Sequence, residues 1–131
     1  MQTLLPPGWT RPKGFSNGIA AEGRLVFVAG MIGTNPAGQI ETDAFVGQAR
    51  QALANILAVL AEAGAKAEHI CRMRWYVTDK QEYLANLREV GAAYRQVIGN
   101  HFPAMTLVEV SALVEDRAKV EIEATAVVPR R

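Results

Sequence analysis

Few residues in this chain have the types and spacing that chemistry needs. There is one cysteine, Cys71, and the two histidines, His69 and His101, lie far apart in the sequence. Cys71 has no partner for a disulfide, and it lacks the second cysteine and the closely spaced histidines of a zinc site. We interpret Cys71 as an inert core residue on an apolar strand face, and both histidines as solvated turn residues. We therefore expect neither redox nor metal chemistry.

Charged residues of opposite sign recur on two strand-like stretches. Arg72 and Arg74 alternate with other residues in the first stretch, and Glu121 and Glu123 alternate with apolar residues in the second. A carboxylate in a cleft can act in acid–base catalysis, and it can equally balance an arginine on a neighbouring strand. For Glu121 both roles stay open, whereas we expect Glu123 to be structural.

The size and charge of the chain exclude several classes of function. At 131 residues the chain fits one domain, residues 1–131, which can bury a core without disulfides or metals. Its net charge of +1 gives no general attraction to nucleic acid or anionic lipid. No apolar run reaches the length of a membrane span, and residues 1–14 lack the apolar core of a signal peptide. We expect a cytoplasmic protein with no nucleic-acid or membrane partner.

The first half of the chain predicts two strands and a helix. Residues 15–20 and 25–29 flank a turn and predict an antiparallel hairpin. Residues 30–40 hold three glycines and a proline, which favours a loop at the rim of a pocket. Apolar residues then recur every three to four positions over 43–63, which predicts an amphipathic helix. Thr42 or Asp43 would cap its start, and Gly64 would end it.

The second half predicts a strand, a helix and two more strands. Residues 70–77 alternate like a half-buried strand, with Met73 and Trp75 on the face toward the helices. Asp79 can cap a second helix that runs to about residue 98. Two strands, 107–113 and 119–127, complete a β-β-α-β-α-β-β order. The predicted fold class is α+β, with one sheet and two helices on one of its faces.

Such a sheet leaves its other face uncovered by helices. The residues that we expect on this face mix charged and apolar types: Arg72, Arg74, Tyr76, Met105, Leu107, Glu109, Glu121 and Glu123. A monomer would expose the apolar members, whereas an oligomer could bury them and pair the arginines with the glutamates. We therefore predict a homo-oligomer.

Several stretches together resemble one known family. They are Gly14-Phe15-Ser16-Asn17-Gly18, Val26 to Ile32, Gln48 to Ile56, Tyr76-Val77-Thr78-Asp79, Phe102-Pro103-Ala104, and Val120 to Ala124. On these stretches the chain resembles the RidA/YjgF family, also called the endoribonuclease L-PSP family, over nearly its whole length. The resemblance implies a chorismate-mutase-like fold of the bacillary type. It also implies a homotrimer with a central barrel and small-molecule clefts between neighbouring subunits.

The best-known activity in that family is hydrolysis of reactive enamines or imines, such as 2-aminoacrylate, to a keto acid and ammonia. The reaction needs no metal or organic cofactor. The resemblance makes Glu121 the candidate catalytic residue that contacts the ligand or the attacking water. It also implies that the ligand lies among six residues: Phe15, Gly30, Met31, Ala104, Met105 and Leu107.

The chain departs from the family pattern at the position that binds the substrate carboxylate. Deaminating members have an arginine after Pro-Ala that holds the carboxylate as a bidentate fork, and this chain has Met105. Leu107, Met31 and Phe15 replace a common cysteine, a polar residue and a tyrosine, and Gly91 aligns with a frequent asparagine. Arg72 or Arg74 could substitute for the missing arginine, although structural ion pairs are the commoner role of such residues.

Two hypotheses follow. The chain is a deaminase-type hydrolase whose substrate range is altered by Met105, or it is a trimer that binds a small metabolite without chemistry. A separate interpretation is that Met31, Met105 and Leu107 simply fill a collapsed cleft, which would then hold no ligand at all. Chorismate mutase shares the implied fold and ranks third. The sequence has no basic stripe with interleaved aromatics and no histidine pair to favour ribonuclease activity.

Overall fold

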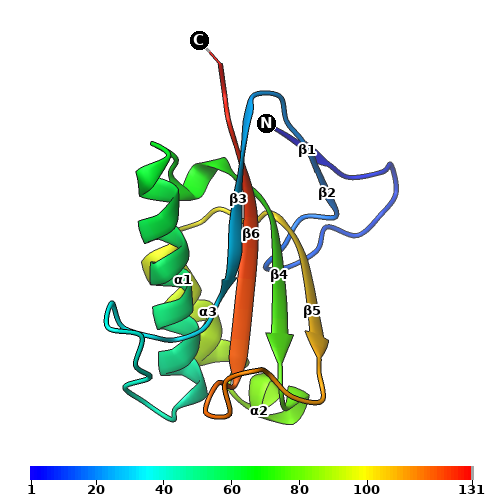
Figure 1. Cartoon of the computed structure of the whole chain (residues 1–131). Coiled ribbons are helices and arrows are strands. Elements are labelled where there is room, and N and C mark those ends of the chain that lie inside the picture. Colours follow the sequence, from blue (N-terminus) through cyan, green and yellow to red (C-terminus); the bar gives the residue numbers. More distant parts are fainter. Residues whose placement is uncertain (131) are drawn as a thin grey trace.

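The computed structural model of the chain describes residues 1–130. The centre of the fold is a four-stranded sheet (Figure 1). Its strands are β3 (Arg24–Met31), β4 (Ile70–Val77), β5 (Ala104–Glu109) and β6 (Val120–Val128). They lie in the order β3-β6-β4-β5, so β3 and β5 form the two edges. β4 and β5 are parallel, and the other neighbours are antiparallel.

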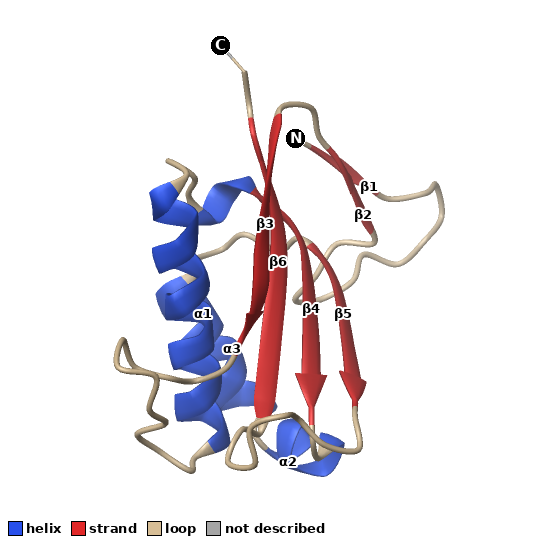
Figure 2. Cartoon of the chain, in the orientation of Figure 1, coloured by secondary structure: helices blue, strands red, loops and turns tan. Residues whose placement is uncertain are grey.

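Two helices, α1 (Phe45–Glu62) and α3 (Leu87–Val97), pack on one face of this sheet (Figure 2). The short α2 (Lys80–Ala85) follows the end of β4, and a 3₁₀ turn, η1 (Ala67–His69), precedes β4. The core lies between the helices and the sheet and includes Leu53, Ile56, Leu60, Met73 and Ile122, all fully buried. The sheet with helices on one face confirms the predicted α+β, chorismate-mutase-like architecture. We call the sheet face opposite α1 and α3 the outer face.

Among residues 1–130, no helix has the length and apolar character that crossing a membrane requires.

β4 has the predicted alternation, except at its first residues. Met73, Trp75 and Val77 are buried on the helix side, and Arg72 and Arg74 are exposed on the outer face. A bulge interrupts the pairing of β4 with β6 between residues 70 and 72. Ile70 therefore enters the core.

Cys71 is consequently only half-buried, and its predicted place in the core is wrong. Its Sγ lies 3.3 Å from the carbonyl oxygen of Thr125, to which the thiol donates. Burial raises the pKa of the Cys71 thiol above its usual value, which favours the protonated form.

The predicted N-terminal hairpin does not form. β2 (Gly18–Ala20) instead pairs antiparallel with β1 (Gln2–Leu4). β3 pairs with β6 rather than with β2. The reason lies at Gly23, where φ is +150° and the backbone lies against the carbonyl of Val128. Only a residue without a side chain fits at position 23, this close to the end of β6. The chain then enters β3, which runs alongside β6.

The face predicted for the β5 side chains is also wrong. β5 starts at Ala104, three residues before the predicted strand, and its register with β4 aligns Met73 with Met105 and Trp75 with Leu107. Aligned residues of neighbouring strands point to the same face. Met105 and Leu107 therefore pack against the core on the helix side, and Thr106 and Val108 take the outer face.

The second predicted helix is interrupted at Asn86. There φ is −114° and ψ is 18°, and the side-chain amide of Asn86 donates to the carbonyl of Glu82. Asp79 caps α2 as predicted, by accepting from the amides of Gln81 and Glu82. Glu109, predicted on the outer face, accepts from the Lys80 amide at the same helix end. Gly64 and Gly99 end α1 and α3 with φ values of +70° and +91°.

Gln48 is a polar residue of α1, yet it is fully buried. Its Nε2 donates to the carbonyls of Thr42 and Arg117, and its Oε1 accepts from the Lys119 amide at 2.8 Å. The side chain thereby joins α1 to the loops that lead into α1 and β6. Neither Thr42 nor Asp43 caps α1 with its side chain; Thr42 Oγ1 accepts from the Ala44 amide instead.

Replacing Gln48 with methionine tests this connection. The substitution keeps the volume but leaves two backbone carbonyls and one amide without their partner. Each buried unsatisfied group costs about 1–3 kcal/mol, so we expect the free energy of unfolding to fall by about 2–4 kcal/mol. Urea unfolding measures it, with the exposed Gln81→Met as the matched control. A loss below about 1 kcal/mol would show that these bonds are dispensable.

Candidate active site

A cavity of about 530 Å³ lies between α3 and the β5 edge of the sheet. Its lining combines aromatic and aliphatic side chains from α2, α3, β4, β5 and the N-terminal loop with two cations: Lys13, Gly14, Phe15, Trp75, Tyr83, Leu87, Val90, Gly91, Tyr94, Arg95, Phe102, Met105 and Leu107. Three of the predicted ligand-binding residues, Phe15, Met105 and Leu107, are therefore brought together. They meet on the helix side of the sheet, because the register of β5 turns Met105 and Leu107 that way.

Ser16 holds Phe15 beside β5. The Ser16 amide donates to the carbonyl of Pro103 at 3.0 Å, and its hydroxyl donates to the carbonyl of Phe102 at 2.5 Å. The same residue forms a parallel bridge with Ala104 at the start of β5. The N-terminal loop is thus fixed at the point where the Phe-Pro-Ala motif enters the strand. Phe15, 39% exposed, forms one wall of the cavity.

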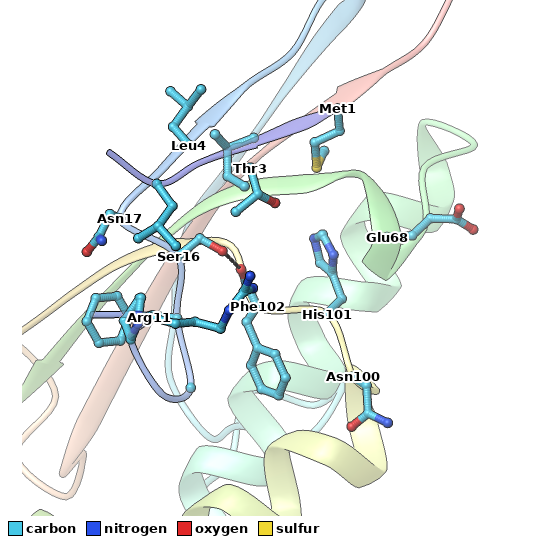
Figure 3. Close-up of a pocket in the computed structure, with 15 residues that line it drawn as sticks. Met1, Thr3, Leu4, Arg11, Ser16, Asn17, Glu68, Asn100, His101 and Phe102 are labelled. Atoms are coloured by element: carbon cyan, nitrogen blue, oxygen red, sulfur yellow. Dashed lines mark hydrogen bonds between the residues drawn. The ribbon is translucent and has the colours of Figure 1, made fainter. Parts of the chain in front are cut away.

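Phe102 separates this cavity from a second one of about 620 Å³, which lies under the N-terminal strands (Figure 3). The rings of Phe102 and Tyr94 are stacked, with centroids 5.7 Å apart. In Figure 3 the Phe102 ring points away from β1, whereas the His101 ring points toward it. The second cavity shares Gly14, Phe15 and Phe102 with the first.

His101 and Tyr94 fix the segment before β5. The Tyr94 hydroxyl donates to the carbonyl of His101, and His101 Nε2 lies 2.6 Å from the carbonyl of Ile70. Because a carbonyl only accepts, this nitrogen must carry the proton. His101 is thus a half-buried structural residue, which corrects its interpretation as a solvated turn residue. His69 is also engaged, since its Nδ1 accepts from the Lys66 amide.

Glu121 and Gly30 form a second group on the outer face. The Glu121 carboxylate lies against Gly30 in the space that a side chain there would occupy. Within residues 1–130, the Glu121 side chain makes no hydrogen bond or ion pair. Gly30 thus leaves room for a half-buried carboxylate that has no cationic partner among the described residues.

Glu123, two residues along the same strand, has the opposite character. It accepts from the Tyr76 hydroxyl at 2.5 Å, and its Oε1 lies 3.7 Å from Nη1 of Arg74. The bond to Glu123 raises the pKa of Tyr76 above its usual value. The structural role expected for Glu123 is supported, because both of its neighbours on β4 engage it.

The predicted site residues do not lie together within one chain. Gly30 lies on the β3 edge strand and Glu121 on the adjacent β6, whereas Met105 and Leu107 lie on the opposite edge strand and the opposite face. Met31 packs toward the core beside Ile122, so its predicted place in a cleft wall is not evident within one chain. Ala104 lies at the start of β5, between Ser16 and Arg72.

Arg72 and Arg74 cannot replace the missing arginine within the chain, because they lie on the face opposite Met105. Two other cations, Lys13 and Arg95, line the cavity instead. The sequence reasoning missed both. The spacing of Arg95 four residues after Gly91 was the available signal, since such residues share one helix face.

No group of three histidine, cysteine, aspartate or glutamate side chains able to hold a metal ion occurs in the described part of the chain. The arrangement offers instead a carboxylate on β6, next to the β3 edge, and an apolar cavity with cations at the β5 edge.

The fold places this chain in a class of small α+β proteins with one mixed sheet and helices on one of its faces. The family model described as endoribonuclease L-PSP matches residues 10–128. The chain belongs to this family, which is also known as RidA/YjgF.

Individual relatives agree. A RutC family protein of Haemophilus influenzae is 38% identical over 106 residues, which cover 80% of each chain. The 2-iminobutanoate/2-iminopropanoate deaminase of Escherichia coli K12 is 36% identical over 109 residues, again 80% of each chain. The crystal structure of the Rid family protein YyfB of Yersinia pestis matches with a TM-score of 0.85 and 30% identity, over 97% of this chain and 98% of that one.

The tyrosines around the cavity predict how stability depends on alkaline pH. Burial raises the pKa values of Tyr83 and Tyr94, and Tyr94 is only 6% exposed. An unfolded tyrosine loses its proton near pH 10. Above that pH the unfolded chain binds fewer protons than the folded chain, so stability is complete below pH 10 and falls as pH rises further. Tyr94 alone should contribute a slope of about 1.4 kcal/mol per pH unit.

Absorbance of the phenolate and circular dichroism, followed together from pH 9 upward, measure this effect. We expect the phenolate signal of Tyr83 and Tyr94 to rise only with unfolding. Ionisation of all three tyrosines near pH 10 in a chain that stays folded would contradict it.

Proposed function

We propose that the chain forms a homotrimer in which the β3 edge of one subunit meets the β5 edge of its neighbour, and that the resulting clefts hydrolyse a reactive enamine or imine. The observation that carries this proposal is the unpaired Glu121 carboxylate beside Gly30, while Glu123 is engaged by Tyr76 and Arg74. A neighbour's cavity with Phe15, Met105 and Leu107 would complete the cleft. The deaminase activity of the Escherichia coli relative supports the reaction type.

The chemistry requires only water. An enamine first tautomerises to its imine, and water then attacks the imine carbon while Glu121 accepts a proton from it. The C–O bond forms and the proton passes from Glu121 to the nitrogen, which gives a carbinolamine. Glu121 then accepts the hydroxyl proton of the carbinolamine and passes it to the amine nitrogen as the C–N bond breaks, which releases ammonia and a carbonyl compound. Backbone groups near Gly30 and Ala104 would hold the water and the substrate in position.

The substrate range should differ from that of relatives with an arginine after Pro-Ala. Loss of one partner of a desolvated charge pair costs about 2–5 kcal/mol, which methionine does not restore. Met105 and Leu107 instead favour an apolar substituent, since each buried methylene contributes about 0.8 kcal/mol. We propose a small imine or enamine with an apolar side chain as the substrate.

A non-catalytic role is the alternative that the same residues favour. Aromatic and aliphatic side chains line most of the cavity, and β5 has no arginine at the position of Met105. A trimer with such clefts could bind a small metabolite without reaction. The hydrolysis assay below decides between the two functions.

Substitution of Glu121 tests the reaction. With freshly generated 2-iminobutanoate or 2-aminoacrylate as substrate, we expect the natural protein to release keto acid faster than the uncatalysed reaction. Glu121→Gln keeps the shape but removes the base, and we expect kcat/KM to fall about 10²–10⁴-fold.

Glu123→Gln is the matched control, because it lies on the same strand and the same face. It should retain most of the activity and lose only the bond to Tyr76. No hydrolysis by the natural protein would favour the binding role, and full activity of Glu121→Gln would remove Glu121 from the mechanism.

The oligomer is tested at the outer face of β3. Phe27 is 73% exposed there and Leu25 57%, which is unusual for large apolar side chains on a strand. Sedimentation equilibrium should give a mass three times the 14.2 kDa of one chain. Phe27→Asp should dissociate the trimer and abolish hydrolysis without unfolding the chain, because the side chain contributes little to the core.

Val114→Asp serves as the control, since Val114 is fully exposed in a loop. It should leave both mass and activity unchanged. A natural protein that sediments as a monomer would contradict the proposed cleft between subunits.

A further inference from the structure

Trp75 has a buried hydrogen-bond donor without a partner. The residue is 3% exposed and lines the cavity at the β5 edge. Its indole Nε1 is the buried side-chain polar atom without an acceptor among the described residues 1–130. A buried N–H without an acceptor is costly, so such groups usually meet an oxygen from a ligand or from water. One residue of the cavity wall therefore has an unused, buried donor.

The charge of the cavity has a single sign. Lys13 and Arg95 line it, and no aspartate or glutamate does. Arg74 on the outer face lies near a glutamate, whereas the Arg95 side chain makes no ion pair or hydrogen bond within residues 1–130. Positive charge beside an unused N–H donor is suited to an anion that accepts hydrogen bonds.

The Arg95 guanidinium lies beside Gly91. Arg95 Nη1 lies 3.3 Å from the point where a Cβ at residue 91 would be. A glycine inside a helix is unfavourable by itself, and here it leaves the space over which the arginine lies. Arg95 is an exposed residue, and its side chain lines the cavity on the α3 side.

We propose that Arg95 binds the carboxylate of the ligand, that the Trp75 indole N–H donates to a ligand oxygen, and that Met105 and Leu107 contact its apolar substituent. Arg95, on α3, would then bind the carboxylate in place of an arginine at position 105 on β5. This inference rests on the proposed function in taking the ligand to be a 2-imino acid. It identifies the specificity-determining residue of this chain and restricts the substrates to small monocarboxylates.

The test uses 2-oxobutanoate, the stable keto acid that hydrolysis of 2-iminobutanoate would release. The chain has two tryptophans, so the ¹⁵N spectrum of the natural protein should hold two indole resonances, which Trp9→Phe assigns. On titration we expect the Trp75 resonance to shift, while that of Trp9, 62% exposed, serves as the internal control. The neutral 2-oxobutanamide should bind more weakly than 2-oxobutanoate.

Arg95→Gln should weaken 2-oxobutanoate binding about 10- to 100-fold and leave 2-oxobutanamide binding nearly unchanged. Arg88→Gln is the matched control, because Arg88 is exposed on the same helix and does not line the cavity. Equal affinity of Arg95→Gln and natural protein for 2-oxobutanoate, no binding to the natural protein, or binding without a shift of Trp75 would each overturn the inference.

Hydrolysis measured on the same proteins separates the two proposals. Arg95-dependent binding without hydrolysis would overturn the enzyme function and support the carboxylate site. Hydrolysis that Arg95→Gln leaves unchanged would overturn the carboxylate site alone.

Discussion

The parallel register between β4 and β5 is the constraint on which the candidate site depends. It aligns Met105 with Met73 and Leu107 with Trp75, so all four side chains point toward the helices. A shift of one residue would turn Met105 and Leu107 to the outer face, because side chains alternate along a strand. The register is held from the other side by Ser16, which binds the carbonyls of Phe102 and Pro103 just before β5. The pairing with β4 and the hydrogen bonds of Ser16 together hold β5 in the position that forms the cavity.

The sheet separates two kinds of chemistry. Its β5 edge, with α3, has apolar walls, two cations and an unused indole N–H. Its outer face, near the β3 edge, has a carboxylate without a partner among residues 1–130. Neither group alone suffices for hydrolysis of an imine, which needs both a place for the substrate and a base for water. The proposed association of subunits would bring the two groups together.

With Met105 the cavity has no arginine on β5, but it keeps a positive charge from other residues. The strand position that would offer a guanidinium fork is apolar, whereas α3 brings a guanidinium to the same cavity over Gly91. Arginine side chains are long enough for one function to be met from different backbone positions. The features that stability alone does not favour, a glycine within α3 and a buried N–H without an acceptor, both lie on this cavity.

The sequence by itself determined the order of the main helices and strands, the ends of the helices at Gly64 and Gly99, the cap at Asp79 and the family. These depend on periodicity, on local backbone preferences and on motifs that neighbouring residues define. The tertiary structure decided the partner of β3, the face of Met105, the burial of Gln48 and the place of Arg95 in the cavity. Each of these depends on contacts between residues far apart in the chain. A local pattern gives the two faces of a strand, but only pairing with its neighbour decides which face meets the core.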